Sequence, residues 1–169
     1  MKKVAMVIAF SMFRDEEYLE PKSVLEHAGV LVETFSDKTG TAQGKFGLQV
    51  QVEKTIADLK LDDFAALLFV GGPGANVFYD SPLAHQIIQE AVLKGKIIGA
   101  ICGAPPILAR AGALKGKKAT MFTDTGDFAS YGAVFTGQGV EVDGRIITAD
   151  GPKSATAWGE AIVRALSHG

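Results

Sequence analysis

Short apolar runs alternate with amphipathic stretches along the 169-residue chain. The apolar runs are rich in Val and Ile, which is typical of strands buried on both faces of a sheet. Between them, apolar residues recur with helical spacing, and several of these stretches open at Ser or Pro and close at Gly. The pattern predicts strands at residues 4–10, 30–35, 67–70, 97–101 and 146–149, and helices at residues 16–28, 82–93, 105–111 and 154–166.

This alternation of strands and helices predicts an α/β fold with a mostly parallel sheet and helices on both faces. Asp143-Gly144 lies between two short strand-like stretches and predicts a small antiparallel hairpin. Residues 39–47 are rich in glycine and polar side chains, so we expect a surface excursion there. Pro21 is expected to kink the first helix, because proline removes a backbone hydrogen bond. The length and the 47% apolar content predict one domain, residues 1–169.

Charge and cysteine content narrow the function classes. The 17 basic and 19 acidic residues give no footprint for nucleic acid or an anionic membrane, so neither partner is expected. No apolar run approaches the roughly 18 residues of a membrane span, and Met1-Lys2-Lys3 leads directly into a strand, which favours a cytoplasmic location. A single cysteine excludes an intrachain disulfide, and three scattered histidines show no zinc-ligand spacing. We therefore expect no metal and no cofactor.

The single cysteine lies where a strand gives way to a helix, in Gly99-Ala100-Ile101-Cys102-Gly103-Ala104-Pro105. A lone cysteine is commonly a small buried hydrophobe. Here, however, small residues surround it, as a sharp nucleophile elbow requires. Pro105 suits the first turn of a helix, whose partial positive charge favours a thiolate. The sequence therefore predicts a reactive Cys102 with a pKa below the usual thiol value of about 8.5.

A glycine-rich turn, Gly71-Gly72-Pro73-Gly74-Ala75, follows the strand at residues 67–70. It lacks the Lys-Ser/Thr ending of a phosphate loop and is not a dinucleotide fingerprint. It is either a plain turn or a close backbone approach that aims N–H groups at an oxyanion. In the second case Gly72 or Gly74 would donate together with Gly103, since Pro73 has no N–H.

Charged side chains cluster in two segments of the chain, one acidic and one basic. Asp15, Glu16, Glu17 and Glu20 lie in the first helix, and the residues alone do not choose which of them faces the thiol. A carboxyl that did so would be pushed toward its protonated form. The lysines at positions 115, 117 and 118 are expected to form a solvated loop.

Several of these segments together resemble the ThiJ/PfpI superfamily: the Cys102 elbow, the Gly71-Gly72 turn, Glu17-Tyr18-Leu19-Glu20-Pro21, residues 142–152 and residues 161–163. The resemblance covers nearly the whole chain. It implies a flavodoxin-like three-layer sandwich, a homodimer, and Cys102 as nucleophile. It also implies that the partner carboxyl is Glu17, because the family glutamate lies four residues before the proline.

The chain departs from the superfamily at two positions. Protease-like members carry histidine directly after the cysteine, where this chain has Gly103. Deglycase-like members often carry a histidine one strand later, which we align with Phe122. Without a nearby histidine, the chain is poorly equipped for a Cys-His hydrolase.

The sequence is compatible with four functions. The first, which the resemblance suggests, is a cofactor-free stress-response reaction of Cys102 with reactive dicarbonyls or their protein adducts, of the glyoxalase or deglycase type. The second, held nearly equal, is a redox sensor or chaperone that uses reversible oxidation of Cys102. A PfpI-type cysteine peptidase is third. A flavin-binding module is fourth, since no Ser/Thr-rich phosphate loop follows the first strand.

Overall fold

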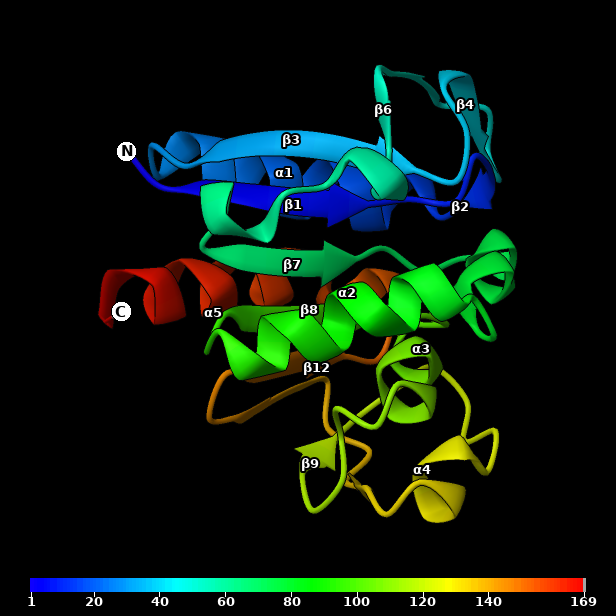
Figure 1. Cartoon of the computed structure of the whole chain (residues 1–169), viewed down its shortest axis with the longest axis vertical. Helices are drawn as coiled ribbons and strands as arrows, with labels where there is room; N and C mark the ends of the chain where they lie inside the picture. Colours follow the sequence, from blue (N-terminus) through cyan, green and yellow to red (C-terminus); the bar gives the residue numbers. More distant parts are fainter. Residues whose placement is uncertain (169) are drawn as a thin grey trace.

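Seven strands form the central sheet of the computed structural model, which describes residues 1–168. All neighbouring strands are parallel except those at residues 140–143 and 146–149, which form the predicted antiparallel hairpin. Its two-residue turn is Gly144-Arg145, one position later than the predicted Asp143-Gly144. The order of the strands in the sheet is β11 (Val140–Asp143), β12 (Ile146–Ala149), β8 (Ile97–Ile101), β7 (Ala66–Phe69), β1 (Lys3–Val7), β3 (Leu31–Ser36) and β6 (Lys54–Thr55). In Figure 1 the arrows of β1, β3 and β7 point in the same direction.

Helices cover both faces of this sheet (Figure 1). On one face lie α1 (Asp15–His27) and α5 (Ala155–His168), and on the other lie α2 (Pro82–Leu93), α3 (Pro105–Arg110) and the short α4 (Asp127–Ser130). Successive β1 residues alternate between the two cores: Val4 and Met6 pack toward α1 and α5, whereas Ala5 and Val7 pack toward α2 and α3. The flavodoxin-like three-layer sandwich is therefore confirmed.

Residues 39–47 are more regular than the sequence predicts. A three-stranded sheet forms from β2 (Ser11–Phe13), β4 (Gly40–Gly44) and β5 (Gln49–Val52), in which β4 pairs with both neighbours. The buried Ala42 and Val52 anchor this sheet to the α1 side of the core. A second small sheet pairs β9 (Lys118–Ala119) with β10 (Val134–Phe135), and 3-10 turns occupy Ile56–Asp58, Leu61–Asp63, Pro73–Phe78 and Pro152–Ser154.

Pro21 does not end the first helix. α1 continues through it to His27, and Pro21 is buried against α5, where a Cβ at Gly159 would lie 3.0 Å from Pro21 Cα. This close crossing keeps the helix in place despite the lost backbone donor. Within residues 1–168, no helix combines the length and the apolar character needed to cross a bilayer.

Candidate active site

Cys102 occupies a strained turn between β8 and α3. Its φ angle is +63°, a conformation that is rare for residues other than glycine. Two backbone hydrogen bonds fix the turn: Cys102 N–H donates to the carbonyl of Ala149 at 2.8 Å, and Phe122 N–H donates to the carbonyl of Cys102 at 2.9 Å. The side chain is 9% exposed. The local chain geometry is therefore that of a nucleophile elbow.

The carboxyl of Glu17 meets Cys102 above Gly71. A Cβ at Gly71 would lie 2.7 Å from Glu17 Oε1 and 2.8 Å from Cys102 Cβ, so the absence of a side chain there lets the two groups approach. Glu17 is fully buried, and neither of its carboxyl oxygens has a partner with ordinary hydrogen-bond geometry. A buried carboxyl without partners is costly, and such groups concentrate at functional sites.

The other three acids of α1 have structural partners. Asp15 accepts from the backbone N–H groups of residues 46 and 48, at 3.0 and 2.9 Å, and so ties down the turn between β4 and β5. Glu16 binds the guanidinium of Arg14 at 2.9 Å. Glu20 accepts from Thr156 Oγ1 at 2.8 Å. Of the four acids, the structure thus brings Glu17 alone to the thiol.

Burial changes the proton affinity of Glu17. Removal from water raises the pKa of this carboxyl to about 7, and contacts with the Cys102 thiol, the Arg14 charge and the Gly71 backbone offset only part of the effect. A carboxyl with this pKa can both accept and donate a proton near neutral pH.

The pKa of Cys102 is raised as well, to about 12. Burial is the largest cause, followed by the negative charge of Glu17, and together they outweigh the backbone N–H groups of Gly103 and Gly72. This is opposite to the lowered pKa that the sequence predicts. The helix that follows has only six residues, and sequence reasoning could not anticipate how far its start is removed from solvent.

Of the three glycines considered as oxyanion donors, the structure places two beside the sulfur. Gly72 and Gly103 both contact Cys102 through their backbone, and a Cβ at Gly103 would lie 3.4 Å from the Gly72 carbonyl oxygen. Gly72 has a φ of +106°, which suits glycine. Gly74 lies elsewhere: it packs against the Ser11 carbonyl and lines a separate cavity near Asn76.

Phe122 is linked to the elbow through its backbone rather than its side chain. Phe122 is 65% exposed, and its ring packs toward Gly151, where a Cβ would lie 3.3 Å from Phe122 Cδ1. Among residues 1–168, no histidine hydrogen-bonds to Cys102. His85 Nε2 instead contacts the Tyr79 carbonyl at 2.7 Å, and His27 lies at the end of α1.

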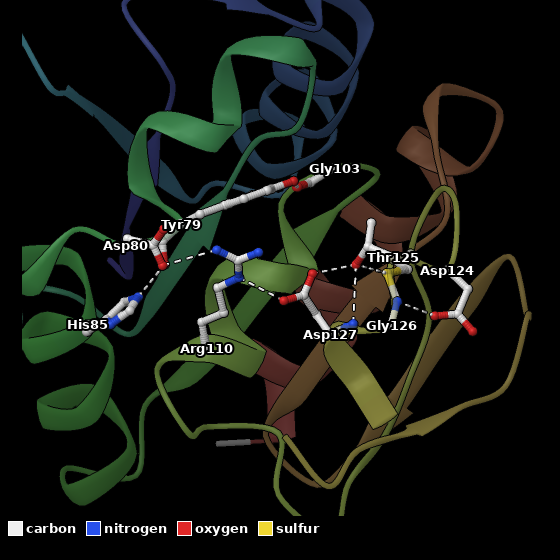
Figure 2. Close-up of polar contacts among 10 residues, drawn as sticks. Tyr79, Asp80, His85, Gly103, Arg110, Asp124, Thr125, Gly126 and Asp127 are labelled. Carbon is white, nitrogen blue, oxygen red and sulfur yellow. Dashed lines mark hydrogen bonds and ion pairs between the residues drawn. The ribbon is translucent and has the colours of Figure 1, made fainter. Parts of the chain in front are cut away.

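A polar network on the α3 side of the elbow was not predicted (Figure 2). Tyr79 Oη donates to the Gly103 carbonyl at 2.5 Å, and the guanidinium of Arg110 lies 5.0 Å from the centre of the Tyr79 ring. Arg110 also binds Asp127 at 2.7 Å and Asp80 at 3.0 Å. No local sequence signal distinguishes Tyr79 from other aromatic residues, because its role depends on contacts across 24 residues of chain.

Comparison with known proteins identifies the family of this chain. The model of the DJ-1/PfpI family matches residues 2–165. Deglycase PfpI of Pyrococcus furiosus is 30% identical over 95% of this chain and 98% of its own, and YraA of Bacillus subtilis, provisionally named a cysteine protease, is 30% identical over 93% and 94%. The crystal structure of a ThiJ/PfpI domain protein from Brachyspira murdochii superimposes with a TM-score of 0.95, at 29% identity over 98% of this chain and 96% of that one. Sequence and fold agree that this chain belongs to the DJ-1/PfpI family.

Proposed function

We propose that this protein is a cofactor-free enzyme that uses Cys102 to convert reactive dicarbonyls, or the adducts that they form on proteins. The observation that carries the proposal is a fully buried, unpartnered Glu17 carboxyl facing a thiol on a strained elbow. The likeness to a relative named deglycase favours this reaction class.

In the proposed first step, Glu17 accepts the thiol proton as the sulfur bonds to a carbonyl carbon. The carbonyl π electrons move onto oxygen, and the backbone N–H groups of Gly72 and Gly103 stabilise the resulting oxyanion. Glu17 then protonates this oxyanion, which its pKa of about 7 permits, and leaves a hemithioacetal on Cys102. A proton moves from the sulfur-bearing carbon to the neighbouring carbonyl carbon through an enediol, which leaves a thioester beside a hydroxyl-bearing carbon. Water then attacks the thioester, the carbon–sulfur bond breaks, and the thiol regains its proton. For a simple dicarbonyl the net reaction adds water and yields a hydroxy acid. One carbon is oxidised and its neighbour reduced, so no external oxidant is required.

This proposal is tested with methylglyoxal as the substrate, by following its loss together with the formation of lactate. The wild type should turn it over, and Cys102→Ala should reduce turnover to the background rate. Glu20→Gln is the matched control, because this acid binds Thr156 on the surface rather than the thiol. Turnover that persists in Cys102→Ala would refute the proposal.

A second candidate is a redox sensor, in which peroxide oxidises Cys102 to a sulfenic and then a sulfinic acid. The same neighbours favour it, since Gly72 and Gly103 N–H groups and a protonated Glu17 could all hydrogen-bond to sulfur-bound oxygen. The raised thiol pKa argues against rapid oxidation, because the thiolate is the reactive form. Intact mass after dilute peroxide would decide: a fast, uniform gain of oxygen without methylglyoxal turnover favours the sensor.

Peptidase activity is the weakest of these proposals, because no described histidine contacts Cys102 and the following residue is Gly103.

We propose a homodimer as well. Three large apolar side chains near the start of α1 are well exposed, namely Met12, Leu19 and Phe46. Sedimentation at micromolar concentration tests this, and Leu19→Lys should weaken a dimer that uses the exposed face. A cytoplasmic location likewise stays a prediction.

A further inference from the structure

Three basic residues line a cavity at the opposite end of β8 from Cys102. The cavity has a volume of about 290 Å³ and is lined by Lys96, Lys117 and Arg145 over an apolar floor that includes Ile98 and Ile146. Lys96 lies just before β8, whereas Cys102 lies just after it. At about 3.3 Å per residue, the cavity and the thiol are separated by the length of the strand, roughly 17 Å.

Backbone contacts bring together the three chain segments that carry these basic residues. Ile98 N–H donates to the Arg145 carbonyl at 2.9 Å, which places the starts of β8 and β12 side by side. Lys118 N–H donates to Asp143 Oδ2 at 2.8 Å, which holds the segment before β9 against the hairpin turn. A Cβ at Gly144 would lie 3.7 Å from Lys117 Nζ, so this ammonium group lies over the turn. The fold therefore places the three basic residues around one cavity.

The cations of this cluster have no direct polar partner among the described residues, although Lys96 lies near enough to Asp62 to help lower the pKa of that carboxyl, after the larger effect of Lys94. Within the described part of the chain, residues 1–168, none of the three cationic groups forms a hydrogen bond or an ion pair. Lys96 and Lys117 are partly buried, whereas Arg145 is exposed. Asp143 is the acid of the adjoining turn, and its Oδ2 is already bound by the Lys118 backbone.

We propose that this cavity binds the phosphate group of a small phosphorylated metabolite. An arginine fork and two ammonium groups match the geometry and charge of a phosphate. Gly95 and Gly144 also line the cavity. The apolar floor would contact the rest of the ligand, and the volume falls at the lower end of the range for small-molecule sites.

The test is isothermal titration calorimetry of the whole protein at constant ionic strength, with AMP, glucose 6-phosphate, inorganic phosphate, citrate and glucose as probes. A phosphate ester should bind with a dissociation constant below about 1 mM. The double variant Lys96→Gln/Lys117→Gln should weaken that binding by about tenfold or more, because each charge-assisted contact contributes at least that factor. Arg145→Gln should do the same. Lys45→Gln/Lys153→Gln, which neutralises two exposed lysines elsewhere, should leave the affinity unchanged.

Three results would overturn the proposal: no ester bound at millimolar concentration, equal affinity in the double variant, or citrate bound more tightly than every phosphate ester. Unchanged melting temperatures of the variants would show that they are folded. Cys102→Ala should bind the ester like the wild type. The outcome is thus independent of whether the protein converts dicarbonyls.

Discussion

Two polar groups flank the Cys102 elbow, and they are built in opposite ways. On the α1 side, Glu17 is fully buried, and its carboxyl oxygens have no partner of ordinary geometry. On the α3 side, the carboxyl of Asp127 is nearly as buried, but it accepts hydrogen bonds from Arg110 and Thr125. The first carboxyl has a strongly raised pKa, while the second is held as one half of an ion pair.

The two carboxyls differ in what they can do: Glu17 can exchange a proton, whereas Asp127 stabilises the structure around it. A partnered buried charge fixes the geometry around it, because moving either member exposes an unpaired charge to the protein interior. An unpartnered carboxyl instead keeps a proton that it can exchange with a neighbouring group. The elbow therefore has one side that can transfer protons and one side that holds it in place.

Glu17→Gln should lower methylglyoxal turnover by about a hundredfold to ten-thousandfold, the usual contribution of a general acid or base. Glutamine keeps the shape and a hydrogen-bond donor but cannot exchange the proton. The measurement is kcat/KM at pH 7. Glu16→Gln is the matched control, since Glu16 binds Arg14, and it should change turnover little. Equal losses in both variants would end the distinction between these neighbouring acids.

The stability of the wild type should depend on pH through Glu17. Its pKa is about 7 in the folded state against an ordinary value of 4.5, so between these values the folded protein keeps a proton that the unfolded chain has released. The free energy of unfolding should therefore fall as pH rises from 4.5 to 7, by about 3 kcal/mol in total. Below and above this window, the contribution of Glu17 should be flat.

Urea unfolding across this pH range measures the effect, and Glu17→Gln provides the reference because it lacks the titrating group. The free energy of unfolding of the wild type, measured relative to that of Glu17→Gln, should fall as the pH rises from 4.5 to 7. A difference that stays constant from pH 4.5 to pH 8 would show that Glu17 titrates normally in the folded protein.

Arg110→Met should destabilise the fold by about 3 kcal/mol, because it leaves the 8%-exposed Asp127 side chain without its counter-charge. Asp80→Asn removes the other carboxylate that binds Arg110. That carboxylate is 84% exposed, so its loss should cost less than about 1 kcal/mol. Chemical unfolding of the two variants gives the comparison. Equal costs would mean that the network supports the elbow no more than an ordinary surface ion pair does.

Tyr79→Phe should destabilise the fold by about 1 kcal/mol, since it removes only the hydrogen bond to the Gly103 carbonyl. The elbow would still be held by the backbone bonds of Cys102 to Ala149 and Phe122. Thermal unfolding measures the loss. A collapse of stability comparable to that of Arg110→Met would show that Tyr79, rather than the ion pair, is the main support.

The sheet and the elbow could be predicted because their signals are local. Buried parallel strands are apolar along their whole length, and a strained turn requires small neighbours, as around Cys102. The β2–β4–β5 sheet was predicted only as a surface excursion, because its strands are short and polar, and because Asp15 stabilises its turn from 31 and 33 residues away.

Within the site, the residues alone did not choose Glu17 from its acidic neighbours. That choice depends on which side of α1 faces the end of β8, and on Gly71 leaving room between them. The thiol pKa was predicted in the wrong direction for the same reason. Desolvation depends on the packing of several strand ends around the sulfur, and a single sequence carries no measure of it.

Cys102 is the only cysteine in the sequence, and this has a consequence for how the site recovers from oxidation. A sulfenic acid is commonly resolved by a second thiol of the same chain, and here there is none to form that disulfide. Reduction would have to come from a thiol outside the chain. At 9% exposure, the sulfur is reached more readily by a small thiol than by the cysteine of another protein. The oxidation state of this site should therefore follow the pool of low-molecular-weight thiols around the protein.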